Sequence, residues 1–567
     1  MSNIKNGVTG ATAHPLDNEK PQVFGIKQAD ARFSSANISV AFLALLIGGL
    51  AGVLQGMARG GMVQLPGWID YYMLLTAHGV MLVVVLSSFF SIGYLYGGVS
   101  YTLGGLPKVA RTIAWAGFSL MVTGLGLATV MILAGEATVL YTFYTPMQAN
   151  PWFYVGLALI VVGIMFNCVG MFITVHKWKK NNPGKITPLF AFISYAVFVL
   201  WFLAALFVAV EVVFMIIPWA FGWIDTTNPL LGRTLFWAFG HTLVNIWMLT
   251  AISAWYVCVP KIIGGKVFSD VLARVAVVLL VIANIPGGFH HQILDPGFSA
   301  GLKFLHVIMT FLIIFPSLMT AFAMFATFEQ TGRAMGAKGL FGWWKKLPWG
   351  DARFFAIIVA MFFFIPAGIG GIINASNQMN QVVHNTIWVT GHLHLTVGTT
   401  VILTFFGISY WLIPLVSRRI MTPIVNKLAI AQTVIWAVGM LLMSGAMHIN
   451  GLLGAPRRTS DTSYLGHSAA AGWAPYETAM AVGGIILFVG IVLMVYIFIN
   501  LMFLAPKGKT EFPIGEVAKG TAPTPLFMDR WAIWIIITII VVAVAYLIPI
   551  FDMLYHTPPG SPPFRTW

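Results

Sequence analysis

Thirteen long apolar runs divide this chain, and each is long enough to cross a bilayer as a helix, for which about 20 residues are needed. Only 8% of the residues are charged while 59% are hydrophobic. Soluble proteins carry about 25% charged residues, so this composition excludes soluble, disordered and fibrous chains. The sequence predicts an all-α polytopic membrane bundle with spans near 37–57, 72–98, 109–134, 152–176, 187–219, 230–258, 267–285, 299–327, 354–373, 386–414, 425–448, 474–505 and 531–551.

The basic residues lie in alternate loops between these runs. Residues 177–185 alone contain four lysines, whereas the loops on the other side are nearly bare. The positive-inside rule therefore predicts a cytoplasmic N-terminal tail (1–36), a single transmembrane domain (37–551) and an outer C-terminal tail (552–567). The first 35 residues lack an apolar core, which argues against a cleaved signal peptide. The net charge of +14 then reflects topology, and we expect no nucleic-acid partner.

Six of the 13 histidines are predicted to lie at a similar depth near the outer ends of four spans. A single buried histidine is most often a hydrogen-bonded packing residue, because an unpartnered imidazole is costly in lipid. Six imidazoles at one depth indicate a cofactor site instead. These residues are His78, His241, His290, His291, His392 and His394.

The spacing of His392 and His394 predicts two separate cofactors. Residues i and i+2 of a helix project about 200° apart, so one metal cannot easily bind both. His78 could complete a closed bis-histidine haem site with one of them, which leaves the other as the axial ligand of an open, five-coordinate haem. Three imidazoles remain, from His241, His290 and His291, and such a set suits copper, iron or zinc with a free position.

These histidines lie in segments that resemble subunit I of the haem-copper oxidase superfamily: TLFWAFGH (234–241), GFHHQILDPG (288–297), PSLMTAF (316–322), VVHNTIWVTGHLHL (382–395) and PRR (456–458). Together with GEATVLYTFYTP (135–146), they look most like its B-type branch. The resemblance implies low-spin haem ligation by His78 and His394, and high-spin haem ligation by His392. It further implies that the second metal is held by His241, His290 and His291, and that the haem propionates lie near Arg457, Arg458 and His384. The alternative for the two arginines is a solvated outer loop.

Position 245 departs from the oxidases of this branch, which carry a tyrosine four residues after the first metal histidine. Asn245 stands there, about 40° round the helix from His241, and should face the same site. In the family, cleavage of O₂ takes four electrons, of which that tyrosine gives one, whereas joining two NO molecules takes only two. The familiar nitric oxide reductases of the superfamily place a glutamate here.

A neutral amide adds no anionic oxygen that would favour iron, so copper is the preferred second metal. The alternative is that Asn245 is a tolerated lesion in a poor oxidase.

Proton delivery is the second departure. B-type oxidases carry protons from the cytoplasm along polar residues of spans 6 and 8. Here Ile252 and Val307 occupy places where the family usually has hydroxyls, while Tyr256 and Thr310 remain. The interrupted line argues against redox-driven proton pumping. Glu211, an acid within span 5, could relay protons from outside, or it could be a satisfied interfacial acid.

The sequence therefore predicts the catalytic subunit of a nitric oxide reductase that uses two haems, expected to be of b type, and one copper. The alternative is a B-type terminal oxygen reductase that works without the tyrosine; a haem-bearing gas sensor or assembly subunit is a third, different class. Cys168 and Cys258 form no CxxC motif, so a covalent haem or thiolate copper centre would belong to another subunit. The resemblance implies a cupredoxin-like subunit II and an external donor, which could be cytochrome c, a small copper protein or quinol, in the cytoplasmic membrane of a bacterium or archaeon.

Overall fold

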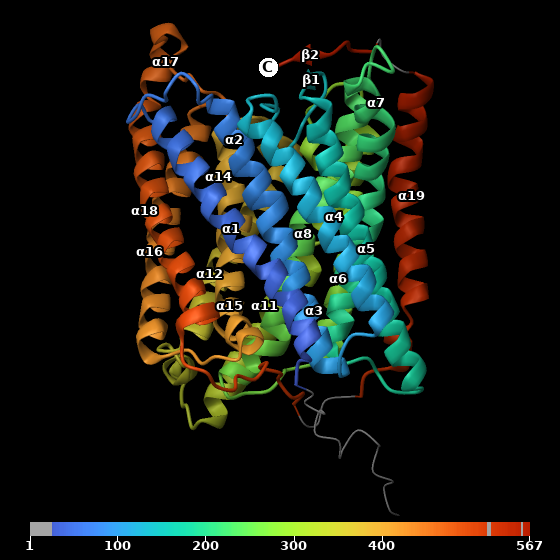
Figure 1. Ribbon diagram of the computed structural model, residues 1–567, viewed down its shortest axis with the longest axis vertical. Coiled ribbons are helices and arrows are strands. Elements are labelled where there is room, and N and C mark those ends of the chain that lie inside the picture. The colour runs from blue at the N-terminus through green and yellow to red at the C-terminus, as the bar shows by residue number, and fades with distance from the viewer. Residues whose placement is uncertain (1–24, 519–522, 557–559) are drawn as a thin grey trace, which may run out of the picture.

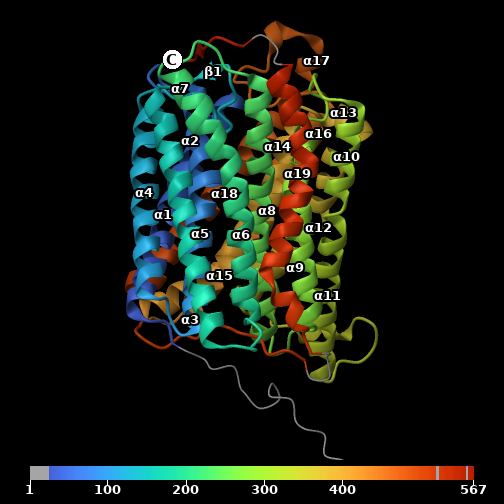
Figure 2. The ribbon, with the colours of Figure 1, turned by 90° about the vertical axis from the view of Figure 1, so that its right-hand side faces the viewer.

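The computed structural model describes residues 25–518, 523–556 and 560–567, and these residues confirm a bundle of 13 long apolar helices. The helices run along the long axis of the molecule in both views (Figures 1 and 2). Most of the predicted tail 1–36 lies outside the described residues. Helix α1 begins at Gln28, earlier than the predicted span, because Asp30 is buried and held by Arg111 at 2.9 Å and by Ser100 at 2.7 Å.

The first six spans follow the chain in order, and two of them contain a π-helical segment. They are formed by α1 (Gln28–Arg59); α2 (Tyr71–Gly79), η1 (Val80–Leu86) and α3 (Ser87–Leu103); α4 (Lys108–Leu133); α5 (Pro151–Asn181); α6 (Leu189–Val210), η2 (Glu211–Ile216) and α7 (Ile217–Ala220); and α8 (Pro229–Ile262). Asp70, Asn150 and Asn228 cap α2, α5 and α8 by accepting hydrogen bonds from backbone N–H groups, which starts each helix at a defined residue.

The remaining seven spans are formed by α9 (Asp270–Asn284) with the 3₁₀ turn η3 (Ile285–Gln292); α10 (Ala300–Phe311) and α11 (Ile314–Ala334); α12 (Ala352–Ala375); α14 (Ile387–Leu395), η5 (Thr396–Val401) and α15 (Ile402–Ser417); α16 (Pro423–Leu452); α17 (Ser468–Ala471), α18 (Ala474–Ile499) and η7 (Asn500–Leu504); and α19 (Trp531–Tyr555). Short helices outside the spans are η4 (Gly342–Lys346), α13 (Asn377–Val383), η6 (Tyr464–Gly466) and η8 (Leu526–Asp529).

Two short strands, which the sequence did not predict, join the C-terminal tail to an earlier loop. β1 (Met147–Gln148) pairs in parallel with β2 (Phe564–Arg565) at the upper end of the bundle in Figure 1. A backbone bridge between Thr227 and Ser561 adds to this contact. The tail therefore closes over the loops that precede α5 and α8.

The helices that carry His241, His392 and His394 form the centre of the bundle. Within the most apolar stretch of α8, 89% of the residues are buried. In the α14–α15 span, all residues of that stretch are buried. The spans built on α4, α10–α11 and α19 are only 28%, 22% and 22% buried, which is expected of helices at the edge of the bundle. The histidines are thus set in the part of the molecule that is best shielded from lipid and water.

Candidate haem and metal centre

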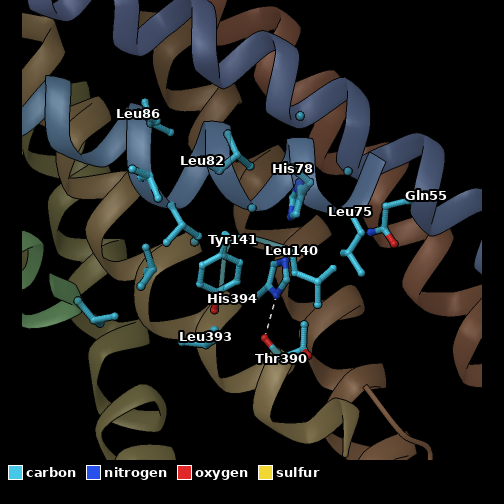
Figure 3. Close-up of a pocket in the computed structure, with 18 of the residues that line it drawn as sticks. Gln55, Leu75, His78, Leu82, Leu86, Leu140, Tyr141, Thr390, Leu393 and His394 are labelled. Atoms are coloured by element: carbon cyan, nitrogen blue, oxygen red, sulfur yellow. Dashed lines mark hydrogen bonds between the residues drawn. The ribbon is translucent and has the colours of Figure 1, made fainter. Parts of the chain in front are cut away.

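His78 on α2 and His394 on α14 reach into one cavity from opposite helices (Figure 3). Their ring centres lie 6.1 Å apart and the ring planes differ by 15°. Nδ1 of His78 donates to the backbone oxygen of Gly48 at 2.9 Å, and Nδ1 of His394 donates to that of Thr390 at 2.8 Å. Because both protons are on Nδ1, each Nε2 keeps its lone pair for a metal, as backbone partners commonly arrange in ligating histidines.

This pair fits a haem. Metal to imidazole bonds of about 2 Å on either side of one ion would separate the two ring centres by roughly 6 Å, as observed. The cavity has a volume of about 320 Å³, and its lining is mostly apolar with Arg59, Arg457, Arg458 and Glu477 among the polar residues. A side chain at Gly52 would put a Cβ 2.4 Å from Nδ1 of His78, so glycine is required for α1 to approach this closely.

A π-helical segment begins two residues after each of these two histidines. η1 begins at Val80, two residues after His78, and η5 begins at Thr396, two residues after His394. A third π-helical segment, η2, begins at Glu211. Such segments widen a helix locally and are frequent at functional sites, so the helices of His78 and His394 are both distorted where the cavity lies.

His392 faces away from this cavity, as its spacing from His394 predicts. Its Nδ1 lies against Gly370 of α12, where an added Cβ would come within 2.5 Å, and 3.4 Å from the hydroxyl oxygen of Thr396. It also interacts electrostatically with His290 and His291. His392 therefore does not line the cavity of His78 and His394, and it lies on the side of His290 and His291, of which His291 itself borders that cavity.

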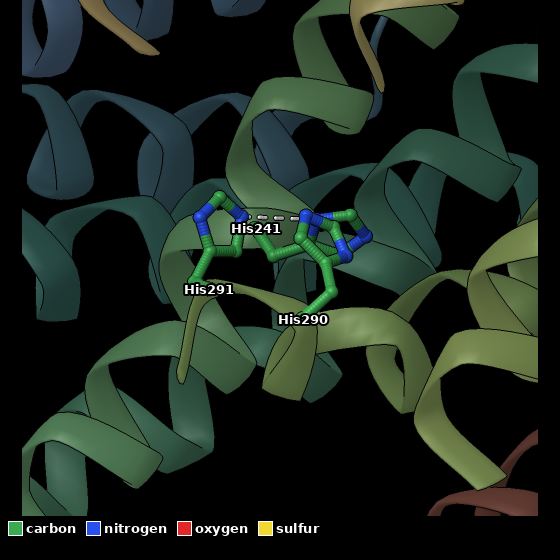
Figure 4. A group of neighbouring side chains, drawn as sticks. All are labelled: His241, His290 and His291. Carbon is green, nitrogen blue, oxygen red and sulfur yellow. Dashed lines mark hydrogen bonds between the residues drawn. The ribbon is translucent and has the colours of Figure 1, made fainter. Parts of the chain in front are cut away.

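His241, His290 and His291 form a compact group whose ligand atoms all lie within 4.8 Å of one another (Figure 4). His241 comes from α8, while the other two come from the 3₁₀ turn η3, which follows α9 and holds Pro286 in its first turn. Nε2 of His291 lies 3.4 Å from Nδ1 of His241, and the indole of Trp237 stacks on His291 with ring centres 3.8 Å apart. His241 and His290 are buried and His291 is half-buried, and three such imidazoles with neighbouring nitrogens and no acidic ligand suit copper.

Thr310 of α10 orients one of these ligands. Its hydroxyl donates to the backbone oxygen of His306 at 2.8 Å and lies 3.1 Å from Nδ1 of His290. The hydroxyl can therefore accept the Nδ1 proton and leave Nε2 of His290 free for a metal. The sequence assigned Thr310 to a proton path, and its contact with His290 became visible only in the folded chain.

Asn245 lies where the helical repeat predicts. Its amide nitrogen donates to the backbone oxygen of His241 at 3.1 Å and lies 3.5 Å from Nε2 of the same residue. In the parts of the chain that the structure describes, no tyrosine has a hydrogen bond or ring contact with His241, His290 or His291. Tyr546 comes near η3, but its hydroxyl donates to the backbone oxygen of Ile285 at 3.0 Å.

A polar cluster adjoins the cavity of His78 and His394 at the upper end of the bundle. Arg457 and Arg458 line the cavity with His78 and His394, whereas His384 contacts Asn380 at 2.8 Å. Within the described residues, no carboxylate forms an ion pair with either arginine; Arg457 donates instead to the Asn385 side chain at 2.8 Å. Burial, the main cause, and the Arg458 charge, the second, lower the pKa of Arg457 to about 10. An anion such as a propionate would stabilise the charged guanidinium here.

Three residues of this cluster were not predicted from the sequence to be site residues. Arg233 forms an ion pair with Asp295 at 2.8 Å, and the guanidinium groups of Arg233 and Arg458 lie 5.0 and 5.1 Å from the centre of the half-buried Tyr144 ring. Burial raises the pKa of Tyr144 and of Asp295, against the pull of the neighbouring arginines. Asp295 belongs to the DPG triplet that follows the metal histidines, which was the available signal.

The residues of the predicted proton path do not form one hydrogen-bonded line. The Tyr256 hydroxyl donates to Thr320 at 3.0 Å, and no hydrogen bond among the described residues joins it to Thr310. Glu211 is only 2% exposed, and its Oε2 has no hydrogen-bond partner in the described part of the chain. It is therefore a buried acid that lacks a full set of partners, and the satisfied interfacial acid considered from the sequence is wrong.

Comparisons with known proteins agree with this geometry. Residues 34–486 match the family model described as cytochrome c and quinol oxidase polypeptide I. Cytochrome c oxidase subunit 1 of Thermus thermophilus is 36% identical over 544 residues, which cover 93% of this chain and 95% of that protein. The probable cytochrome c oxidase subunit 1 of Bradyrhizobium diazoefficiens is 22% identical over 478 residues, covering 80% of this chain and 67% of that protein.

A solved structure is similar over nearly the whole chain. It is described as a heme-copper terminal oxidase dimer, with a TM-score of 0.89 and 34% sequence identity, and the match covers 95% of this chain and 96% of that one. The likeness confirms the all-α membrane bundle, and with the 13 apolar helices it makes this a multi-pass membrane protein. The chain therefore belongs to the cytochrome c and quinol oxidase polypeptide I family, the oxidoreductase subunit I of the haem-copper oxidases.

Proposed function

We propose that this chain is the catalytic subunit of a membrane nitric oxide reductase, which converts two NO, two electrons and two protons into N₂O and water. The observation that carries the proposal is the Asn245 amide 3.5 Å from Nε2 of His241. An amide cannot supply an electron and a proton as a phenol does, so the described residues offer no fourth electron donor beside the three histidines. Coupling of two NO molecules does not need one.

Oxygen reduction is the second candidate, and the relatives favour it. Both named relatives are cytochrome c oxidases and the similar solved structure is a terminal oxidase. Judged by these comparisons alone, the oxygen-reducing alternative is better supported than nitric oxide reduction. The two candidates share every histidine and differ at position 245, so the local chemistry is our reason for preferring NO.

We infer three cofactors from the donor sets. His78 and His394 would hold a low-spin haem, His392 a high-spin haem, and His241, His290 and His291 a copper ion, with iron less suited to three neutral imidazoles. Arg457 and Arg458 would bind the propionates, with His384 close by. When bound, the open haem iron and the copper supply the electrons to the gas. Both haems are proposed to be of b type.

Residues around this centre orient its histidines and shield one of them. Thr310 fixes the tautomer of His290, and Trp237 covers one face of His291. We propose that protons reach the centre through the buried Glu211, and that the broken line between Tyr256 and Thr310 makes the cytoplasmic route a poor one.

Topology and partners follow from the same proposal. The N-terminus lies in the cytoplasm of a bacterium or archaeon, and the C-terminus and the histidine centre lie toward the outside. Because the described residues hold no soluble electron-entry domain, a cupredoxin-like subunit II in the same membrane would receive electrons from cytochrome c, a small copper protein or quinol.

Gas assays on the purified complex test the proposal. Anaerobic consumption of NO with one N₂O formed for every two NO supports nitric oxide reduction. Fast reduction of O₂ to water, with slow NO turnover, would establish the oxidase instead. If haem and copper are bound but neither gas is reduced, the chain belongs with the haem sensors or assembly subunits.

A further inference from the structure

A buried ion pair at the upper end of the His78 and His394 cavity has no assigned role. Arg59, the last residue of α1, and Glu477 on α18 have side chains only 7% and 8% exposed, with Nε of Arg59 3.6 Å from Oε1 of Glu477. Both residues line the haem cavity and also a separate pocket of about 460 Å³. The pair therefore forms the wall between the two cavities.

Arg59 holds the backbone on either side of the two cavity arginines. Its guanidinium donates to the backbone oxygen of Pro456 at 2.9 Å and to that of Thr459 at 3.4 Å. Arg457 and Arg458 are the two residues between these carbonyls. A rigid planar fork with several donors is what such a two-point contact requires, and lysine could make only part of it.

Glu477 fixes the same loop further along. Its Oε2 accepts a hydrogen bond from the Thr462 hydroxyl at 2.7 Å, while its other oxygen faces Arg59. On the opposite side, the Arg457 N–H donates to the backbone oxygen of Asn385 at 3.1 Å. The loop 456–462 is thus held from α1, from α18 and from the segment before α14.

The loop needs this support because its backbone is strained. Arg458 has φ +66° and Asn385 has φ +58°, in the left-handed region that residues other than glycine seldom adopt. Such a conformation costs free energy and persists only where the surroundings hold it. Without the pair, Arg458 would be free to relax and turn its side chain away from the cavity.

We propose that Arg59 and Glu477 are positioning residues that hold Arg457 and Arg458 over the low-spin haem and set its midpoint potential; this rests on the proposed haem site. Buried charges interact strongly because little water screens them. A positive charge beside the haem disfavours the ferric state and raises the potential, whereas a negative charge lowers it. The charges of Arg59 and Glu477 therefore change the midpoint potential in opposite directions.

Redox titration of the low-spin haem in the purified holoenzyme, followed by its visible spectrum, tests this balance. Arg59→Gln removes a positive charge and the two-carbonyl contact, so it should lower the midpoint potential. Glu477→Gln should raise it, because the amide oxygen can still accept from Thr462 and only the negative charge is lost. The double variant should lie between them. Arg59→Lys keeps the charge but loses part of the two-carbonyl contact, so its potential should lie between those of Arg59→Gln and the wild type. Arg333→Gln, which removes the exposed partner of Glu329, is the matched control and should leave the potential unchanged.

Opposite shifts support the proposal, because mere damage to the fold would move both single variants the same way. Shifts of one sign, or none, overturn it. If Arg59→Gln does not retain haem, Glu477→Gln carries the test alone, and anything but an upward shift overturns the proposal. A wild-type protein without a bis-histidine haem spectrum would instead contradict the proposed haem site itself.

Discussion

The amide nitrogen of Asn245 lies 3.5 Å from Nε2 of His241, one helical turn away on the same face of α8. This contact puts a group without redox chemistry beside His241, one of the three proposed copper ligands, where a phenol would serve oxygen cleavage. In the proposed function, the choice between the two gases depends mainly on this side chain.

Asn245→Tyr should restore a phenol beside His241. We expect the ratio of O₂ to NO reduction to rise by about tenfold or more, since that is a change of only about 1.4 kcal/mol in relative barrier. Oxygen uptake and NO consumption measured on the same preparation check this. Asn245→Phe adds a ring without the hydroxyl and is the control; equal ratios in both variants would contradict the role given to the phenol.

Thr310→Val should weaken the second metal site. Loss of the hydroxyl 3.1 Å from Nδ1 of His290 removes the partner that fixes its tautomer, and such losses cost about 10- to 100-fold in metal affinity or activity. Copper content per chain during chelator titration is the measurement. Thr310→Ser keeps the hydroxyl and should retain copper, and the spectrum of the haem on His78 and His394 should be unchanged in both variants.

Glu211→Gln should slow the reaction by about a hundredfold if Glu211 relays protons, which is within the usual range for loss of a proton-transfer group. Electron entry into the low-spin haem, followed by stopped-flow spectroscopy, should keep its rate. Glu136→Gln is the control, because Glu136 accepts a hydrogen bond from Asn150 in a loop at the upper end. Normal turnover in Glu211→Gln would contradict the relay.

His384 should make the folded protein less stable in mild acid. Burial, followed by the charges of Arg457 and Arg233, lowers its pKa to about 4, against about 6.5 in the unfolded chain. Between these values the unfolded state binds more protons, so stability falls as the pH falls from 7 to 5. In His384→Gln this contribution, about 1 to 2 kcal/mol at pH 5, is absent.

Thermal unfolding at pH 5, 6 and 7 measures this effect. The Tm of His384→Gln should fall less than that of the wild type on acidification. Parallel curves would mean that an anion, such as a haem propionate, holds the imidazole in its charged form.

NO turnover in proteoliposomes should not acidify the outside medium. The Tyr256 hydroxyl is bonded to Thr320 and not to Thr310, so the cytoplasmic line has a gap that only water could bridge. A pH indicator outside the vesicles, with an uncoupler as the control, follows the protons. Net proton release during turnover would refute the absence of pumping.

Most of the candidate site could be predicted from the sequence because its parts lie within single helices. Helical rise fixed the depth of His241 in its span, and the angle per residue fixed the opposite directions of His392 and His394. The same repeat put Asn245 beside His241. Apolar run length likewise predicted all 13 spans, although it missed the earlier start of α1, which depends on the buried Asp30 and its partner Arg111.

What the sequence could not determine is which groups meet across the bundle. Arg59 and Pro456 are 397 residues apart and bond at 2.9 Å, and Thr310 reaches His290 from another helix. The periodicity of one helix says how its own side chains point, but not which neighbour faces them. The sequence by itself thus determined the spans, the opposite directions of His392 and His394, and the amide at position 245. Only the tertiary structure decided the support of the arginine loop and the missing partner of Glu211, because both depend on the packing of distant helices.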